Sequence, residues 1–336
     1  MTLTLDITTV SPMGITTRVL GAEDADALAA LMMRIEGDHP TGFCLGAGEI
    51  REVMGGNAEN VFEGALDGDD LVAYTAVLPG RPDGSRLYVT LFGDVDPARL
   101  GEGTGTLMLS RALHRSRSLH AALAPVVPGR FTAAALAGRE DQADLLRRAG
   151  MRPGRHSFLM VADLDRRLAV EPPAGYAVTA FDPAAAEELR QAHNGAFADH
   201  PDRAGATPEF WAMFVVGPAH ARHALSAVAR DASGAVAAYV LAHEYAVPPS
   251  GGPGPEVHVP YVGTLPAHRG HGLATGLLAE VLRRASDAGY VTASLNVDTA
   301  NPTGALGIYE RAGFRPLYRQ DSYHLDAPPA GDRLSR

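Results

Sequence analysis

Two landmarks occur twice in this chain, in the same order and at similar spacing. Residues 97–105 align without a gap onto residues 266–274, and both segments precede apolar residues at helical spacing. Further along, residues 149–153 align onto residues 312–316. One glycine match could arise by chance, but two matches in one order indicate that a domain has been duplicated.

The repeat divides the chain into two domains. A chain of 336 residues exceeds the usual size of a single hydrophobic core. Between the halves stand Pro172 and Pro173, and paired prolines continue neither a helix nor a strand ladder. We therefore predict a first domain at 1–170, a linker at 171–175, a second domain at 176–327 and a disordered polar tail at 328–336.

Apolar patterns predict the elements of the second domain. Strands are expected at 176–181, 224–229, 236–246, 256–265 and 291–297, and helices at 183–197, 272–288 and 301–312. A last strand at 314–325 closes the sheet, and the first half ends in a similar strand at 158–161. The fold class is therefore α/β (α+β), with one twisted mixed sheet flanked by helices in each domain.

Composition and charge exclude several classes of function. The 29 basic residues against 39 acidic ones give a net charge of −10, which disfavours nucleic-acid binding and mildly favours a cationic acceptor. All 29 basic residues are arginine, so lysine-nucleophile chemistry is excluded. Cys44 is the sole cysteine, which leaves no intrachain disulfide and no cysteine zinc cluster.

No segment of the sequence suggests export or a membrane. The first residues lack the basic and apolar regions of a signal peptide, and no stretch has the length and apolarity of a membrane span. We expect a cytoplasmic protein without a membrane or nucleic-acid partner. The sequence leaves open whether it is a monomer or a homodimer.

A glycine-containing loop separates a predicted strand from a predicted amphipathic helix. Its sequence is Arg269-Gly270-His271-Gly272-Leu273-Ala274. Glycines let backbone N–H groups point into one concavity, and the helix N-terminus adds the positive end of its dipole. Arg269 can add a charge-assisted contact to a phosphate. The pattern favours a pyrophosphate site, although two glycines also suit a simple tight turn. A Rossmann fingerprint is set aside because Ala274 takes the place of its third glycine.

Two motifs of the second domain resemble those of the GNAT acetyltransferases. Residues 262–274 are similar to the coenzyme A-binding motif of that family, a strand followed by Pro-x-x and Arg-x-x-Gly-x-Gly/Ala. Its downstream motif resembles the series Asn301, Ala305, Tyr309, Gly313 and Phe314. The resemblance covers residues 176–325. The duplicated layout resembles tandem-domain actinobacterial members of the family, mycothiol synthase-like proteins among them.

The resemblance implies acetyl-CoA as co-substrate and a role for each motif residue. Main-chain groups of Val262, Thr264 and Leu265 would pair with the pantetheine arm and polarise the thioester carbonyl. Asn301 would touch the pantetheine or fix its loop, and Tyr309 would protonate the departing thiolate. Without the motif, Tyr309 would be a half-buried helix aromatic. The pyrophosphate would be held by the amides of Gly270, His271, Gly272, Leu273, Ala274 and Thr275.

An amine acceptor must lose a proton, so the reaction needs a base or a water relay. Glu256 and His258 alternate on the strand before the loop and therefore share one face. His258 is an open candidate for the base, whereas Glu256 fits a solvated start of the strand better. Lesser candidates on the preceding strand are His243, Glu244 and Tyr245.

Other side chains have both a functional and a structural interpretation. Asp199 and His200 lie where members of the family shape the acceptor pocket, and Trp211 either lines that pocket or belongs to the core. His268 and His271 have no carboxylate at ligand spacing, so a phosphate loop accounts for them better than a metal site. No metal is expected.

The first domain keeps the glycines of the loop but loses its chemical residues. Leu100, Leu146 and Gly138 stand at the places of the arginine, the tyrosine and the asparagine. This pattern predicts a degenerate scaffold domain that could still hold a coenzyme A molecule.

The leading hypothesis is an N-acetyltransferase. It would move an acetyl group from acetyl-CoA to a primary amine of a small molecule by direct transfer in a ternary complex. A protein N-acetyltransferase and a non-catalytic coenzyme A-binding module are the alternatives. The sequence names neither the amine acceptor nor the preferred acyl chain.

Overall fold

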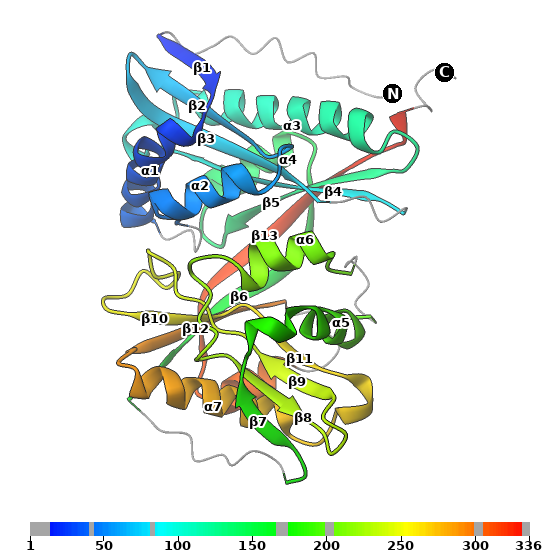
Figure 1. The fold of residues 1–336 in the computed structure, drawn as a ribbon. Coiled ribbons are helices and arrows are strands. Elements are labelled where there is room, and N and C mark those ends of the chain that lie inside the picture. Colours follow the sequence, from blue (N-terminus) through cyan, green and yellow to red (C-terminus); the bar gives the residue numbers. More distant parts are fainter. Residues whose placement is uncertain are drawn as a thin grey trace. The chain divides into compact units, whose positions relative to one another are not determined.

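The computed structural model of the chain describes residues 14–39, 44–80, 85–165, 174–198, 205–298 and 305–330. The chain forms two compact units (Figure 1). Unit 1 consists of Met1–His156 and Gln320–Arg336, and unit 2 consists of Ser157–Arg319. Each unit is described by itself below.

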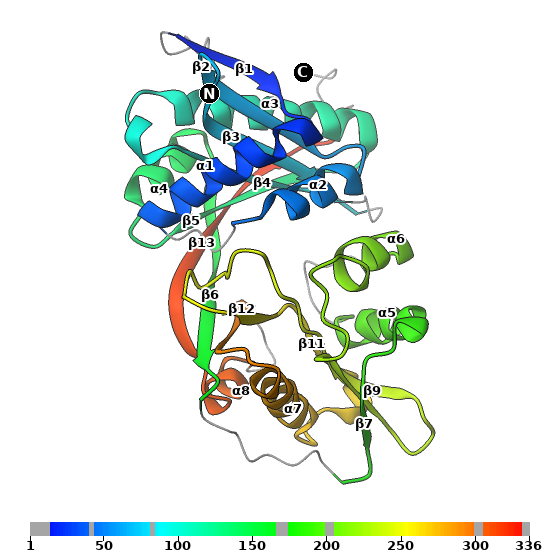
Figure 2. The same ribbon diagram turned by 60° about the vertical axis from the view of Figure 1, so that its left-hand side comes forward.

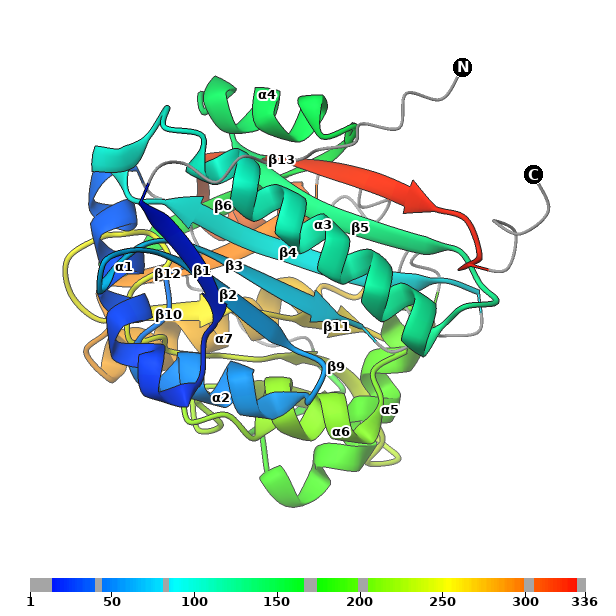
Figure 3. The same cartoon turned by 90° about the horizontal axis from the view of Figure 1, so that it is seen from above.

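Unit 1 has a twisted sheet with helices on both faces. Its strands, in spatial order, are β1 (Ile15–Val19), β2 (Val61–Asp67), β3 (Asp70–Pro79), β4 (Leu87–Val95), β5 (Gly129–Leu136) and the second part of β13 (Arg315–Ala327). Its helices are α1 (Ala25–Asp38), α2 (Ala47–Gly56), α3 (Thr104–Leu123) and α4 (Glu140–Arg148). Figure 2 shows α1 and α2 in front of the sheet, and Figure 3 shows α3 lying across its other face.

The pairing within unit 1 changes along β4. Strands β1 to β4 are antiparallel neighbours, and β4 is parallel to β5. The parallel register covers only residues 87–90 of β4, whereas residues 91–95 pair with β3 alone in the described part of the chain. The second part of β4 therefore diverges from β5.

Unit 2 repeats this plan. Strands β7 (Ala177–Ala180), β8 (Ala227–Arg230), β9 (Val236–Val240) and β11 (Val262–Thr264) are antiparallel neighbours in this order. Strand β10 (Glu256–Val259) is parallel to β12 (Thr292–Asp298), which pairs antiparallel with the second part of β6 (Arg152–Asp163). The helices are α5 (Ala186–Ala196), α6 (Pro208–Trp211), α7 (Leu273–Asp287) and α8 (Ala305–Arg311). Among the helices of the described ranges, none combines the length and the apolar character needed to cross a bilayer.

Strand β9 shows how the core of unit 2 is built. Its residues alternate between the two faces of the sheet, as the strand period of two requires. Ala238 and Val240 pack in one apolar cluster with the buried face of α7. Tyr239 packs in a second cluster with Leu189 of α5 and with Trp211. The sheet is therefore buried on both faces, and each fully buried large side chain contributes about 1.5–3 kcal/mol.

The strand predicted at 256–265 is divided in two. Strands β10 and β11 are separated by Pro260 and Tyr261, and the chain changes its neighbour from β12 to β9 at this point. Pro260 has no N–H to donate to a ladder, which favours a break here. The prediction of one continuous strand is therefore wrong, and the break determines the geometry of the candidate site.

The last strands of the two halves also differ from the prediction. Residues 320–327 of β13 pair with β5 in unit 1 and do not close the sheet of the second half. Residues 157–163 of β6 pair with β12 in unit 2. The halves thus exchange their last strands, because an alternating pattern predicts a strand but not its neighbour. Most of the predicted linker at 171–175 and of the tail at 328–336 lies outside the described residues.

Candidate functional site

Two strands of unit 2 begin side by side and then separate. Strand β10 pairs with β12 as far as Val259 and Leu295. Beyond that point β11 pairs with β9, whereas residues 296–298 of β12 pair with β6. The edges of β11 and β12 that face each other therefore share no ladder in the part of the chain that the structure describes. We call this gap the β11–β12 opening.

The ladder between β11 and β9 decides which main-chain groups face the opening. The carbonyl of Tyr261 accepts a bond from the amide of Leu241, the residue after β9, and the amide of Leu265 donates to the carbonyl of Ala237 in β9, each at 3.0 Å. Because successive residues of a strand point these groups to opposite sides, the N–H and C=O groups of Val262 and Thr264 point into the opening. Leu265 is different, because its amide is used in the ladder and its carbonyl accepts a bond from the amide of His268 at 2.9 Å.

The loop that follows β11 exposes amide groups at the start of α7. Gly270 and Gly272 have φ angles of +81° and +77°, a backbone conformation that suits glycine. The first intrahelical bond runs from the amide of Gly276 to the carbonyl of Gly272 at 3.0 Å. The preceding amides have no acceptor within the helix and lie at the positive end of its dipole. They belong to Leu273, Ala274 and Thr275.

Arg269 links this loop to its neighbours. The side chain is exposed, and its Nη2 donates to the carbonyl of Ala196 at 2.9 Å. Its Nε lies 3.4 Å from the carbonyl of Thr264. The guanidinium therefore connects the end of α5, the end of β11 and the loop. An anion bound at the loop would therefore lie close to the Arg269 guanidinium.

Gly263 is a feature of the site that the sequence motif did not single out. A Cβ at this position would lie 2.6 Å from Cζ and 2.7 Å from Oη of Tyr239. The Tyr239 ring is 1% exposed, and its hydroxyl lies 2.6 Å from Nδ1 of His193. The ring therefore lies flat against the backbone of β11. A glycine inside a predicted strand is the signal for such a close approach.

The tyrosine of the downstream motif lies in α8. The ring of Tyr309 meets Phe314 edge-on, with 6.2 Å between ring centroids. Burial raises the pKa of its phenol to about 12, so the hydroxyl is protonated at neutral pH. Asn301, Asp199 and His200 lie outside the described residues.

His258 is buried and uncharged at neutral pH. Its side chain is 6% exposed, and Nδ1 lies 2.9 Å from the hydroxyl of Ser294, its register partner on β12. Burial, and then the charge of His220, lower the pKa of His258 to about 4. A group that acts directly as the base would have to be more exposed and more basic than His258.

Glu256 is not the solvated strand start that the sequence suggested. Its side chain is 3% exposed, and it accepts a hydrogen bond from the hydroxyl of Ser250. The other oxygen, Oε1, is buried without a hydrogen-bond partner among the described residues. The expectation of a solvated residue here is wrong, because the chain of the preceding loop covers the start of β10.

The lesser candidates for a base are all engaged within the fold. The ring of His243 donates from Nε2 to the carbonyl of Val215 at 2.9 Å, and burial lowers its pKa to about 3. Glu244 accepts bonds from Tyr290 at 2.6 Å and from Arg222 at 2.7 Å. The ring of Tyr245 lies 5.6 Å from that of His258, centroid to centroid.

Trp211 and His268 have structural contacts. Trp211 is 2% exposed and belongs to the apolar cluster beside α5, which fits the core interpretation. Nδ1 of His268 lies 3.1 Å from the hydroxyl of Tyr176, and Nε2 lies 3.7 Å from Asp231. Within the described ranges, no three potential ligands converge as a metal site would require.

Comparison with known proteins assigns this part of the chain. Residues 183–314 match the acetyltransferase (GNAT) family. This match lies within unit 2, which is therefore similar to the GNAT acetyltransferases. Members of that family transfer acyl groups from acetyl-CoA. A search of curated proteins finds no match.

Solved structures extend the likeness to both units. A GCN5-related N-acetyltransferase from Sphaerobacter thermophilus is 25% identical, with a TM-score of 0.75 over 95% of this chain and 97% of its own. A tandem GNAT protein from the clavulanic acid biosynthesis pathway is 18% identical, with a TM-score of 0.71 over 94% of this chain and 99% of its own. The chain therefore has a tandem GNAT fold.

Proposed function

We propose that unit 2 transfers an acetyl group from acetyl-CoA to a primary amine of a small molecule, directly and within a ternary complex. The observation that carries this proposal is the β11–β12 opening, where the main-chain groups of Val262 and Thr264 face away from β9. An extended amide-containing arm can pair with these groups as an added strand would. The acidic net charge of −10 favours a cationic acceptor.

The proposed binding site follows the chain from β11 into α7. The pantetheine arm lies along Val262 and Thr264, and the pyrophosphate lies at the amides of residues 270–275. These amides, together with the helix dipole, favour an anion. Arg269 adds a positive charge at the same place, and Asn301 is assigned to the pantetheine by the motif alone.

The proposed reaction forms a C–N bond and breaks the C–S bond of the thioester. The amine nitrogen attacks the carbonyl carbon, and a main-chain amide of β11 stabilises the negative charge that develops on the oxygen. Coenzyme A leaves as a thiolate and takes a proton from Tyr309. With a pKa of about 12 the phenol of Tyr309 is protonated at neutral pH, so it is available as a hydrogen-bond donor to the thiolate that forms.

The proton that the amine loses needs a route to an acceptor. His258 and Glu256 are both buried, so we propose that water connects the amine to one of them. His258 is neutral at physiological pH, and only its Nδ1 is engaged with Ser294 among the contacts of the described residues. Three points remain predictions: a small-molecule amine as the acceptor, a protein acceptor as its alternative, and a mycothiol synthase-like identity.

The experiment is a thiol-release assay with acetyl-CoA and a panel of primary amines. Tyr309→Phe should slow the thiol release that depends on unit 2 about 100-fold while leaving the Kd of unit 2 for acetyl-CoA unchanged, because general acid catalysis contributes about 10²–10⁴-fold. Tyr88→Phe is the matched control in β4 of unit 1 and should leave the rate unchanged. An unchanged rate in Tyr309→Phe would show that the acid is another group.

A further inference from the structure

Unit 1 contains a cavity of about 540 Å³ where β4 and β5 diverge. The second part of β4 forms one wall, and β5, α3 and α4 form the others. Much of the lining is apolar and includes Leu91, Met108, Leu109, Leu145 and Leu146. The sequence predicts a degenerate scaffold in this unit, yet the divergence that marks the candidate site of unit 2 is present here as a cavity.

Part of the cavity lining comes from the glycine loop before α3. Gly101 and Gly103 have φ angles of +82° and +89°, as the corresponding glycines of unit 2 do. The amide of Leu107 donates to the carbonyl of Gly103 at 3.1 Å, which leaves the amides of residues 104–106 without an acceptor inside the helix. Gly101, Gly103 and Thr106 line the cavity.

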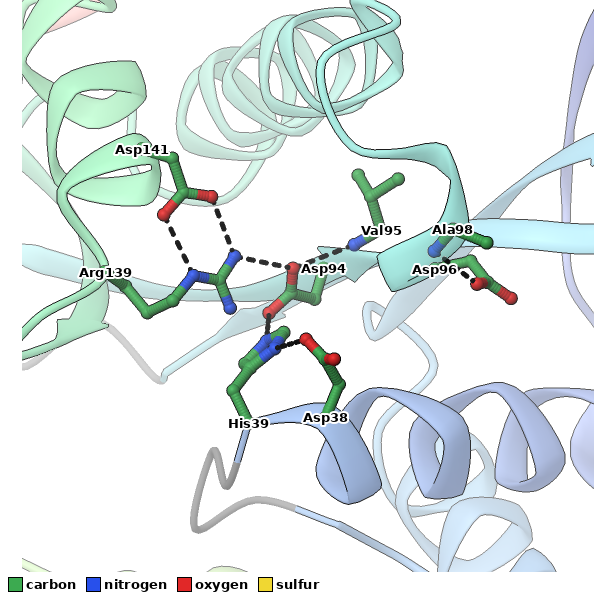
Figure 4. A network of polar contacts seen from close by, with 8 residues as sticks. All are labelled: Asp38, His39, Asp94, Val95, Asp96, Ala98, Arg139 and Asp141. Atoms are coloured by element: carbon green, nitrogen blue, oxygen red, sulfur yellow. Dashed lines mark hydrogen bonds and ion pairs between the residues drawn. The ribbon is translucent and has the colours of Figure 1, made fainter.

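Polar side chains make up another part of the lining, and Figure 4 shows the contacts among them. Nε2 of His39 lies 3.2 Å from Oδ2 of Asp94, and Nδ1 lies 3.2 Å from Asp38. Asp94 also accepts a bond from the amide of Val95 at 2.9 Å and lies 3.6 Å from Nη2 of Arg139. The charges alternate along this chain of side chains, which begins at the end of α1, crosses β4 and ends at the start of α4.

Asp141 fixes the Arg139 guanidinium, but one of its nitrogen atoms has no hydrogen-bond partner among the described residues. Its Nε and Nη2 donate to Asp141 at 2.9 and 3.0 Å, and the side chain is 15% exposed. Its Nη1 is buried without a hydrogen-bond partner in the described part of the chain, and so is the hydroxyl of Thr75, which is 4% exposed. Both residues line the cavity. Buried donors without a partner are costly, so an acceptor such as a carbonyl oxygen in the cavity would stabilise Arg139 once its side chain turns Nη1 towards it.

The polar part of the lining also suits a cation. Three carboxylates, on Asp38, Asp94 and Asp141, lie beside the Arg139 guanidinium and the His39 ring, so negative charge is in excess in either protonation state of His39. A ligand that carries a carboxylate would add to this excess of negative charge. A ligand with a neutral carbonyl at Arg139 and a protonated amine beside Asp94 would not. A carbonyl and an amine are the two partners of an acyl transfer.

We infer that unit 1 is a second acyl-transfer centre, in which Arg139 binds the carbonyl of an acyl thioester and His39 takes the proton of an amine acceptor. This inference rests on the proposed function in one respect, the use of acetyl-CoA as donor. The amine nitrogen forms a bond to the carbonyl carbon, and the C–S bond breaks. A protonated amine first loses one proton to solvent. The second proton passes to Nδ1 of His39 as the C–N bond forms and then to the departing thiolate, so no further reactant is needed.

The two carboxylates beside His39 have different freedom. Asp94 has a 9% exposed side chain and fixes the ring through Nε2, whereas Asp38 is 58% exposed and can turn into solvent to release Nδ1. The bond to Asp94 raises the pKa of His39, burial and the charge of Arg139 oppose the rise, and the bond to Asp38 adds to it. An Asp-linked imidazole of this kind is a usual general base.

The sequence supplies an independent observation for His39. The tripeptide Asp38-His39-Pro40 ends the first helix of the first half, and the tripeptide Asp199-His200-Pro201 occurs at the corresponding place of the second half. The tripeptide is therefore a further part of the sequence that the two halves share.

The test is a thiol-release assay on four proteins, with acetyl-CoA as donor and tyramine, glucosamine and spermidine as acceptors. The proteins are the unmodified chain, Arg269→Glu, His39→Gln and the double variant. If both units react, each single variant keeps part of the rate and the double variant loses at least about 100-fold. If only unit 2 reacts, Arg269→Glu abolishes release and His39→Gln leaves it unchanged, which overturns the inference. If only unit 1 reacts, the reverse result overturns the proposed function alone. No release from the unmodified chain overturns both.

Two further measurements separate chemistry from structure. In the Arg269→Glu background the remaining rate should rise with pH to a plateau above the raised pKa of His39, and His39→Gln should remove this rise. His114→Gln is the matched control, because His114 is exposed on α3 of the same unit and lies outside the cavity lining. A flat pH profile in the Arg269→Glu background would contradict the role of His39. Arg139→Gln, checked for folding by its unfolding midpoint, should weaken acetyl-CoA binding to unit 1.

Discussion

Gly263→Ala tests whether the Tyr239 ring fixes the geometry of β11. The added Cβ would lie 2.6 Å from Cζ and 2.7 Å from Oη of a ring that is 1% exposed. The ring cannot move away without breaking its 2.6 Å contact to His193 and disturbing the cluster around Trp211. Overpacking of this kind costs about 1–3 kcal/mol, and a lost buried hydrogen bond costs about 1 kcal/mol more.

We therefore expect Gly263→Ala to destabilise unit 2 by about 2–4 kcal/mol. A cost of about 3 kcal/mol corresponds to a fall in the unfolding midpoint of about 6–12 °C for a unit of this size. Trp211 is the single tryptophan of the chain and lies in this cluster, so its fluorescence reports the unfolding of unit 2.

Two controls make the experiment specific. Gly307→Ala in α8 would meet only the end of the Arg311 side chain and should be neutral or stabilising. In a Tyr239→Leu background, the cost of Gly263→Ala should fall because the ring is absent. A change below about 0.5 kcal/mol in Gly263→Ala, the range of a neutral surface substitution, would refute the reasoning.

Three further predictions concern charge and topology. The bond to Asp94 raises the pKa of His39, so the stabilisation of unit 1 by protonated His39 is present below about pH 6.5. This stabilisation is lost as the pH rises through the pKa of His39 in the folded state. His39→Gln should reduce the resulting fall in the urea midpoint of unit 1. Burial lowers the pKa of His243 to about 3 and of His258 to about 4, so unit 2 should lose stability as the pH falls from about 6.5 towards 4, and a constant midpoint there would contradict this burial. Truncation after Arg319 removes the partner of β5, so hydrogen exchange at residues 129–136 should accelerate while α7 stays protected.

Local chemistry was the part of the site that could be predicted from sequence. The φ angles of Gly270 and Gly272 and the start of α7 depend on neighbouring residues, and the glycine pattern indicates them directly. The repeat of this pattern at 97–105 predicted the corresponding loop of unit 1. The duplicated fold followed from these short-range signals.

Long-range contacts were the part that could not be predicted. The burial of Glu256 depends on the loop that carries Ser250, and no periodic pattern indicates it. The exchange of the last strands depends on which edge each strand meets, and alternation along β13 is the same in either case. His39 and Asp94 are 55 residues apart, and only the fold brings them together.

The measurement that tests the central claim most directly is hydrogen exchange of the unmodified chain with and without saturating acetyl-CoA. We expect slower exchange in peptides that cover residues 262–275, because the amides of Val262 and Thr264 and those of the 270–275 loop gain acceptors. Peptides from α5 and β8 should change little. Unchanged exchange at residues 262–275, with acetyl-CoA bound elsewhere or not at all, would contradict the assignment of the co-substrate to the β11–β12 opening.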